Sequence, residues 1–127
     1  MSLDLEQTYL LLGAGGDVAQ LPGGEEFWQL AESELAQTGA GWLVSEYFFE
    51  QDWPSWEMHP HADELVYLLS GAAMLHLQEA DGVRVIALSG RGAVLVPRGI
   101  WHTAKVVSPS RMLHITRGEG TQTRPAQ

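Results

Sequence analysis

Residues 59–71 read HPHADELVYLLSG and join a pair of histidines to an apolar segment. The segment from Leu65 to Leu69 ends at Ser70-Gly71, as a short strand ends at a turn. His59 and His61 are two residues apart, so in an extended chain both imidazoles lie on the same face. This stretch therefore predicts a β-strand that directly follows two histidines able to reach one ion.

Similar short segments, rich in β-branched and aromatic residues, recur on both sides of this stretch. The predicted strands are 42–49, 65–69, 73–77, 83–88, 93–96, 103–107 and 111–116. The predicted turns between them are Ser70-Gly71, Asp81-Gly82, 89–92, 97–99 and 108–110. Short strands with such regular turns, and almost no helical periodicity, predict an all-β sandwich or barrel.

The length of 127 residues suits a single domain. Residues 25–31, EEFWQLA, follow a Pro-Gly-Gly turn and begin with two acids, which predicts one short helix. We expect residues 1–40 to be a strand and helix extension of the same domain and residues 41–117 to be the barrel. Residues 118–127 are polar, and we expect them to form a flexible C-terminal tail.

The composition argues against several classes of protein. The chain has no cysteine, which excludes disulfides, thiolate metal sites and cysteine nucleophiles. Its apolar runs are too short to cross a membrane and its N-terminus does not resemble a signal peptide, so we expect a cytoplasmic protein without a membrane partner. The net charge is −9, and no basic patch with interleaved aromatic residues is present, so we expect no nucleic-acid partner.

The charges are unevenly divided along the chain. Fifteen of the sixteen acidic residues precede position 84, whereas all seven basic residues lie at or after it. These opposite charges could pair across strands or across a dimer contact. The alternative is that they form separately solvated faces that contribute little to stability.

The histidines give the strongest chemical signal. His102 follows a turn at Pro97-Arg98-Gly99, where a strand is predicted to begin. Neutral imidazole binds Zn, Ni, Cu and Fe, and a carboxylate such as Glu64 adds a hard oxygen ligand. Three histidines and one glutamate would leave open positions on a five- or six-coordinate ion, as a catalytic metal site requires. The spacing of these residues alone fits surface histidines in a turn equally well.

Taken together, these residues resemble the two motifs of the cupin superfamily. The first motif, G-x5-H-x-H-x3or4-E-x6-G, corresponds to HPHADE from His59 to Glu64, then six intervening residues and Gly71. The second motif, G-x5-P-x-G-x2-H-x3-N, corresponds to PRGIWH from Pro97 to His102. The resemblance covers residues 59–106. It implies a jelly-roll β-barrel, here with a short N-terminal helical segment, that usually forms a homodimer.

The resemblance also implies one divalent metal ion in the mouth of the barrel. The family's ligand positions carry over to His59, His61, Glu64 and His102. Iron, manganese, nickel and zinc are all candidates, and the sequence does not choose among them.

The first motif is shorter than in the family, because only Ala62 and Asp63 separate His61 from Glu64. Either the chain bends at these two residues, or one of His61 and Glu64 does not reach the metal. We expect His61 to be the less secure ligand, because Glu64 keeps its spacing to Gly71. Three other positions depart from the motifs at turns and edges: Trp53 and Arg91 stand at opening glycines, and Val106 replaces the closing asparagine.

Three more residues are candidate catalytic acid–base groups, namely His114, His76 and Tyr47. For the two histidines, the alternative is a hydrogen-bonded structural role. Aromatic residues cluster around the motifs and could form a cage for a planar or apolar ligand, or pack in the core of the barrel. They are Trp53, Trp56, Trp101, Tyr47 and Phe49.

Two classes of function remain open from the sequence. The first is a metal-dependent cupin enzyme acting on a small molecule, whether an isomerase, a dioxygenase or a lyase, with the metal as a Lewis acid or a centre for O₂. The second is a non-catalytic cupin that binds a sugar, a small metabolite or a metal as a sensor or storage module. The short first motif favours the second class, because an incomplete ligand set can still bind without turning over.

Overall fold

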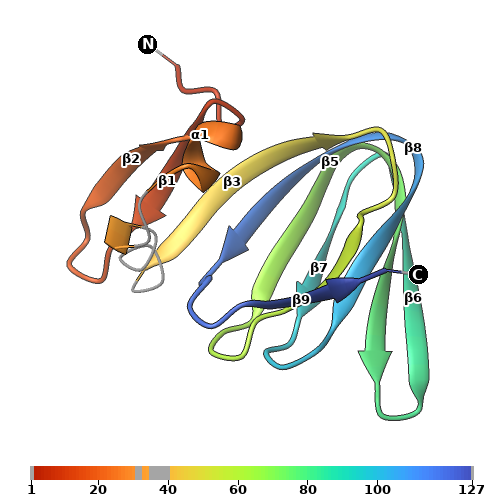
Figure 1. Ribbon diagram of the computed structural model, residues 1–127. Coiled ribbons are helices and arrows are strands. Elements are labelled where there is room, and N and C mark those ends of the chain that lie inside the picture. The colour runs from red at the N-terminus through yellow and green to blue at the C-terminus, as the bar shows by residue number, and fades with distance from the viewer. Residues whose placement is uncertain (1, 31–32, 35–40, 127) are drawn as a thin grey trace.

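The computed structural model describes residues 2–30, 33–34 and 41–126. Its elements with described bounds are nine strands and one short helix (Figure 1). In chain order they are β1 (Thr8–Leu12), β2 (Val18–Pro22), α1 (Glu25–Trp28), β3 (Trp42–Phe49), β4 (Ser55–Met58), β5 (Glu64–Glu79), β6 (Gly82–Ser89), β7 (Gly92–Val96), β8 (His102–Thr116) and β9 (Gln122–Pro125).

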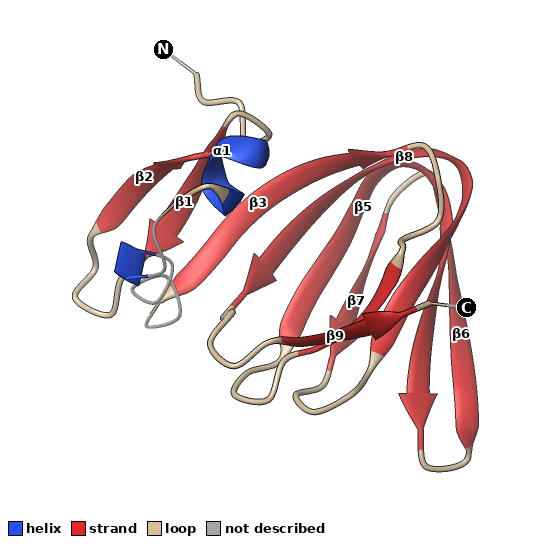
Figure 2. Ribbon diagram, in the orientation of Figure 1, coloured by secondary structure: helices blue, strands red, loops and turns tan. Residues whose placement is uncertain are grey.

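All strand pairs are antiparallel, and they form one continuous system in the order β2-β1-β3-β8-β4-β9. The strand β5 joins this system by pairing with β8, and it also pairs with β6 and β7. The two long strands β5 and β8 run through both layers of the barrel, which face each other across the interior (Figure 2). The predicted jelly-roll all-β fold is confirmed.

The long strands bend where the sequence analysis placed turns. The register between β5 and β8 shifts between Leu68 and Ala73, as it does at β-bulges. Gly71 has a φ of 98°, and a Cβ added to it would clash with the carbonyl oxygen of Pro109. The hydroxyl of Ser110 closes the same corner by donating to the carbonyl of Ala72, at 3.1 Å. The predicted turns at Ser70-Gly71 and 108–110 are therefore wrong as strand ends: they are bends within continuous, still-paired strands.

The core lies between the two layers and is built mainly from alternate residues of β5 and β7. In β5, for example, Leu75 and Leu77 are fully buried while His76 between them is only partly buried. Since successive side chains of a strand point to opposite faces, His76 lies on the outer face of the barrel. The buried cluster comprises Trp53, Val66, Leu68, Ala73, Leu75, Leu77, Val94, Val96, Ala104 and Met112.

Four strands lie outside the predicted strand ranges. The hairpin of β1 and β2 extends the sheet beyond β3 and, with α1, falls within the expected extension of residues 1–40. The strands β4 and β9 pair with each other, so residues 122–125 form a strand inside the segment expected to be a flexible tail. Residue 31 of the predicted helix lies outside the described residues. The division into extension, barrel and tail stays a prediction.

Candidate metal centre

The two motif segments are held together by hydrogen bonds that backbone N–H groups of the second segment donate to the first. The N–H of Gly99 donates to the carbonyl of His59 at 2.9 Å. The N–H of Arg98 donates to the carboxylate of Asp63 at 3.0 Å, and this bond lowers the pKa of Asp63. The loop that carries His59 is thereby fixed against the turn that leads to His102 at the start of β8.

Glu64, the first residue of β5, lies at the centre of a cluster of buried imidazoles. Its Oε1 is 2.8 Å from Nε2 of His102 and 3.3 Å from Nε2 of His59. Its Oε2 is 3.5 Å from Nδ1 of His114 and accepts a hydrogen bond from the hydroxyl of Thr116. Glu64 and the three histidines are all buried, so one carboxylate faces three imidazoles away from bulk water.

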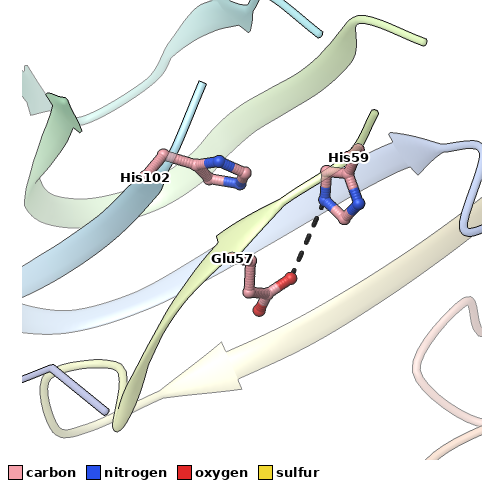
Figure 3. A group of neighbouring side chains, drawn as sticks. All are labelled: Glu57, His59 and His102. Atoms are coloured by element: carbon pink, nitrogen blue, oxygen red, sulfur yellow. Dashed lines mark ion pairs between the residues drawn. The ribbon is translucent and has the colours of Figure 1, made fainter. Parts of the chain in front are cut away.

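Glu57 belongs to the same group, and the sequence analysis missed it. Ligand atoms of Glu57, His59 and His102 all lie within 4.8 Å of one another (Figure 3). Glu57 Oε1 is 3.8 Å from Nε2 of His59, and Glu57 is the cross-strand partner of His102 where β4 pairs with β8. A signal was present in the sequence, because Glu57 precedes His59 by two residues, which is the spacing that puts two strand residues on one face.

The Nδ1 atoms of the two central histidines have partners outside the cluster. Nδ1 of His102 donates to the carbonyl of Ile100 at 3.1 Å. Nδ1 of His59 lies 2.8 Å from the hydroxyl of Thr121, in the loop before β9. Such contacts fix the orientation of a ring and leave its Nε2 directed at the cluster, as is typical of metal-binding histidines.

The electrostatics of the cluster follow from its burial and its pairing. Burial would raise the pKa of Glu64, but the imidazoles of His102, His114 and His59 oppose this effect and hold that pKa well below its ordinary value. Burial would lower the pKa of His102, but the carboxylate of Glu64 raises it above the ordinary value of 6.5. Without a metal, Glu64 is therefore ionised, and the proton on His102 is held by an ion pair.

Three atoms at the centre of the cluster fit a bound cation. Oε1 of Glu64 and Nε2 of His59 and of His102 are all buried, and Oε1 faces both imidazole nitrogens at once. A divalent cation among the three atoms would bind all of them directly, in place of the protons that otherwise pair them. Imidazole nitrogen with carboxylate oxygen suits zinc, iron, manganese and nickel.

The remaining candidates from the sequence lie in different places. His61 is exposed, and its ring lies beside Gly120 in the loop between β8 and β9 rather than in the cluster. His76 lies on the outer face of the barrel, as described above. The ligand role of His61 and the catalytic role of His76 stay predictions that this placement does not support. His114 and Tyr47, in contrast, lie together beside the cluster, with ring centroids 5.4 Å apart.

A cavity of about 510 Å³ opens next to the cluster. Glu57, His59, Glu64, His114 and Tyr47 are among the residues that line it. Burial, helped by the neighbouring Tyr9, raises the pKa of Tyr47 far above its ordinary value, so its hydroxyl stays protonated. The volume is in the range of small-molecule sites, about 300 to 1,000 Å³.

The sequence of the chain matches no known family profile and no curated protein. Solved structures do match its fold. A cupin-2 domain protein from Shewanella frigidimarina is 16% identical, with a TM-score of 0.51 over 59% of this chain and 69% of that one. Hydroquinone 1,2-dioxygenase from a Sphingomonas species, with 4-hydroxybenzoate bound, is 20% identical, with a TM-score of 0.51 over 59% of each chain.

Oxalate decarboxylase from Bacillus subtilis, whose Mn(II) centres were studied, is 19% identical, with a TM-score of 0.52 over 66% of this chain and 23% of that one. The match thus spans less than two thirds of the dioxygenase and about a quarter of the decarboxylase. At these identities the likeness shows the fold alone: the chain has the cupin fold. Within the described residues, no helix is long and apolar enough to span a lipid bilayer.

Proposed function

We propose that the protein is a metal-dependent enzyme that acts on a small molecule bound in the cavity beside Glu64. The observation that carries this proposal is the convergence of one buried carboxylate oxygen on two buried imidazole nitrogens beside a cavity of about 510 Å³. A divalent metal held there would act as a Lewis acid towards an oxygen of the substrate.

Four side chains would hold the metal. His59 and His102 would bind through Nε2, and Glu64 would bind through Oε1 and compensate one positive charge. We propose Glu57 as the fourth ligand. It would take the role that the cupin resemblance implies for His61. Iron, manganese, nickel and zinc remain the candidate ions; the Mn(II) centres named for a protein of the same fold support a metal of this class.

Two residues of the cavity are suited to proton transfer. His114 contacts Glu64 through Nδ1, while its Nε2 is buried and lacks a partner among the described residues. This nitrogen can accept a proton from a substrate or donate one to it. Tyr47, with its raised pKa, can donate a hydrogen bond but does not ionise near neutral pH. Whether the reaction is an isomerisation, a dioxygenation or a lyase reaction depends on the substrate.

Metal analysis followed by activity screening tests this proposal. Protein purified without chelators should contain about one divalent ion per chain, and small-molecule turnover should depend on added Fe, Mn, Ni or Zn. Protein that takes up none of these ions at neutral pH would contradict the proposal.

A non-catalytic binding module is the second candidate. It is favoured by the exposed position of His61, which leaves the ligand set without one histidine that the cupin resemblance implies. Metal and small-molecule binding without turnover under any of the four metals would favour this candidate over the enzyme.

We also propose that the protein forms a homodimer in the cytoplasm. The strands β6 and β7 each pair only with β5 among the described strands, and Val83 and Val85 of β6 are about half exposed. Exposed strand edges of this kind are usually covered by association. Light scattering that gives only the monomer mass at all concentrations would contradict the dimer.

A further inference from the structure

We infer that the cavity takes a neutral compound with one aromatic ring and a hydroxyl group, that is, a molecule of the phenol class. This inference rests on the proposed function, because it names the substrate class of the same site. Three features of the cavity carry it: an aromatic wall, hydroxyl groups beside the metal cluster and, among the described residues, the absence of lysine and arginine from the lining.

The wall of the cavity is aromatic. Tyr47 and Phe49 of β3 lie nearly parallel, with an interplanar angle of 25° and ring centroids 5.8 Å apart. Trp53 continues the wall, 5.4 Å from Phe49. From α1, Phe27 and Trp28 complete it. Rings bury large apolar area and favour stacked or edge-on contact with another ring, so this wall selects a flat apolar body.

Hydroxyl groups also line the cavity, beside the metal cluster. Thr116 and Thr121 line it, and both are already bonded to cluster residues, namely Glu64 and His59. Thr123 of β9 also lines the cavity. A hydroxyl on the bound ring would face donors and acceptors here while its ring contacts the aromatic wall.

None of the seven basic residues, all of which lie in the described part of the chain, lines the cavity. Each has a partner elsewhere. The contacts are Arg84 with Glu79, Arg91 with Tyr67, Arg98 with Asp63, Lys105 with Asp52, Arg111 with Glu6 and Glu46, Arg117 with the Trp42 ring, and Arg124 with the Trp101 ring.

The lining is acidic instead. Glu57 and Glu64 carry two negative charges, which would cancel the charge of one divalent ion. A substrate with two negative charges would therefore meet no surplus positive charge in the site, and burying it unpaired is costly. A neutral substrate suffers no such penalty, so the charge of the site excludes dianions and permits phenols.

Binding of three probes that differ in aromaticity and in charge tests the inference. Phenol, cyclohexanol and the dianion of benzene-1,3-dicarboxylic acid are titrated calorimetrically into metal-loaded and into metal-free protein. We expect phenol to bind at least about tenfold more tightly than the dianion and several-fold more tightly than cyclohexanol. Dianion binding equal to or tighter than phenol binding, or equal affinity for phenol and cyclohexanol, would overturn the inference.

Matched variants locate the binding. Phe49→Ala should weaken phenol binding about tenfold, and Phe49→Leu should do so less, because it keeps apolar volume but loses the ring. Phe48→Ala is the control, since Phe48 is the chain neighbour on the exposed face, against Arg111. Thr123→Lys should increase affinity for the dianion. Equal effects of Phe49→Ala and Phe48→Ala, in variants with wild-type circular dichroism, would contradict the assigned wall.

Metal content is measured on the same samples. Protein that holds metal but does not prefer phenol would refute the substrate class and leave the metal site standing. Protein that prefers phenol but takes up no metal would refute the proposed function and leave the cavity assignment standing.

Discussion

Glu64 illustrates how one buried residue can organise a site. Its carboxylate faces three imidazoles and a hydroxyl, and each of its oxygens has a separate set of partners. A buried carboxylate without such partners would be protonated, whereas here the imidazoles keep it ionised. The imidazoles that would bind a cation therefore also keep Glu64 ionised, and the negative charge of Glu64 would attract that cation.

Replacing this charge should be costly for metal binding. We expect Glu64→Gln, which preserves size and shape, to weaken the metal affinity by about 100-fold or more, because a ligand and a charge are both lost. Isothermal titration with Zn²⁺ or Mn²⁺ measures the effect, and Glu79→Gln on the exposed end of β5 is the control. An affinity within about threefold of wild type would show that Glu64 is not a ligand.

The hydroxyl of Thr121 offers a finer test of the site. It lies 2.8 Å from Nδ1 of His59, and partners of this kind commonly change metal affinity by about 10- to 100-fold when removed. We expect Thr121→Ala to weaken metal binding by about tenfold and Thr121→Ser, which retains the hydroxyl, to change it little. Equal affinities of the two variants would mean that this contact does not orient His59.

Protons should compete with the metal for His102. Its pKa is raised by Glu64, so the imidazole keeps its proton to a higher pH than a free histidine does. Because the metal requires the deprotonated nitrogen, the apparent affinity should be greatest above the raised pKa and should fall as the pH is lowered through it. Calorimetric titrations between pH 5 and 8, in buffers of differing ionisation enthalpy, would report the released proton. A pH-independent affinity with no proton release would contradict this expectation.

At the scale of the elements, the corner formed by β5 and β8 positions the site. The two strands stay paired as they pass from one layer to the other, and Gly71 makes the bend possible because its φ of 98° and the nearby Pro109 carbonyl both exclude a side chain. Glu64 and His102 begin these same two strands, so the corner fixes the path of both.

Gly71→Ala should therefore destabilise the protein more than an alanine at another left-handed glycine. Gly90 has a φ of 78° but no atom within 4 Å of an added Cβ, so Gly90→Ala should cost only about 1 kcal/mol. We expect Gly71→Ala to cost about 3 kcal/mol or more, because the backbone must also move. Urea unfolding of both variants measures the difference, and equal free energies of unfolding would refute it.

The same elements show what local sequence can and cannot predict. The strand at 42–49, and the strands at 73–77 and 83–88 with the turn at Asp81-Gly82 between them, were predicted from apolar segments and turn residues, which are local signals. Whether Gly71 ends a strand or lets it bend depends on the remote Pro109 and Ser110, so the predicted turn there was wrong. β9, with the polar sequence QTRP, has no apolar pattern of its own; it pairs with β4 and was not predicted.

The candidate site, like the strands, was predicted from the sequence only in part. The motif resemblance singled out His59, Glu64 and His102, which the fold brings together from segments far apart in the chain. The placement of His61 outside the cluster depends on the path of the loop through Ala62 and Asp63, which spacing does not determine. Glu57 was missed because β4 itself was not predicted.

At the scale of the whole molecule, the division of charge along the chain becomes a set of pairs between remote segments. Arg111 of β8 contacts Glu46 of β3 and Glu6, and Lys105 contacts Asp52. These side chains are exposed to varying degrees, so such pairs contribute little stability individually. These ion pairs matter for function because they hold basic residues on the outside of the barrel. The lining of the interior cavity is acidic and aromatic.

We propose that His59 and His102 hold a divalent metal, whereas His61 does not. Elemental analysis of the wild type and of His59→Ala, His102→Ala and His61→Ala, all purified without chelators, tests it most directly. We predict about one ion per chain in the wild type, none retained stoichiometrically in His59→Ala or His102→Ala, and nearly wild-type content in His61→Ala. A metal-free wild type, or a His102→Ala protein that keeps its full metal content, would contradict the account.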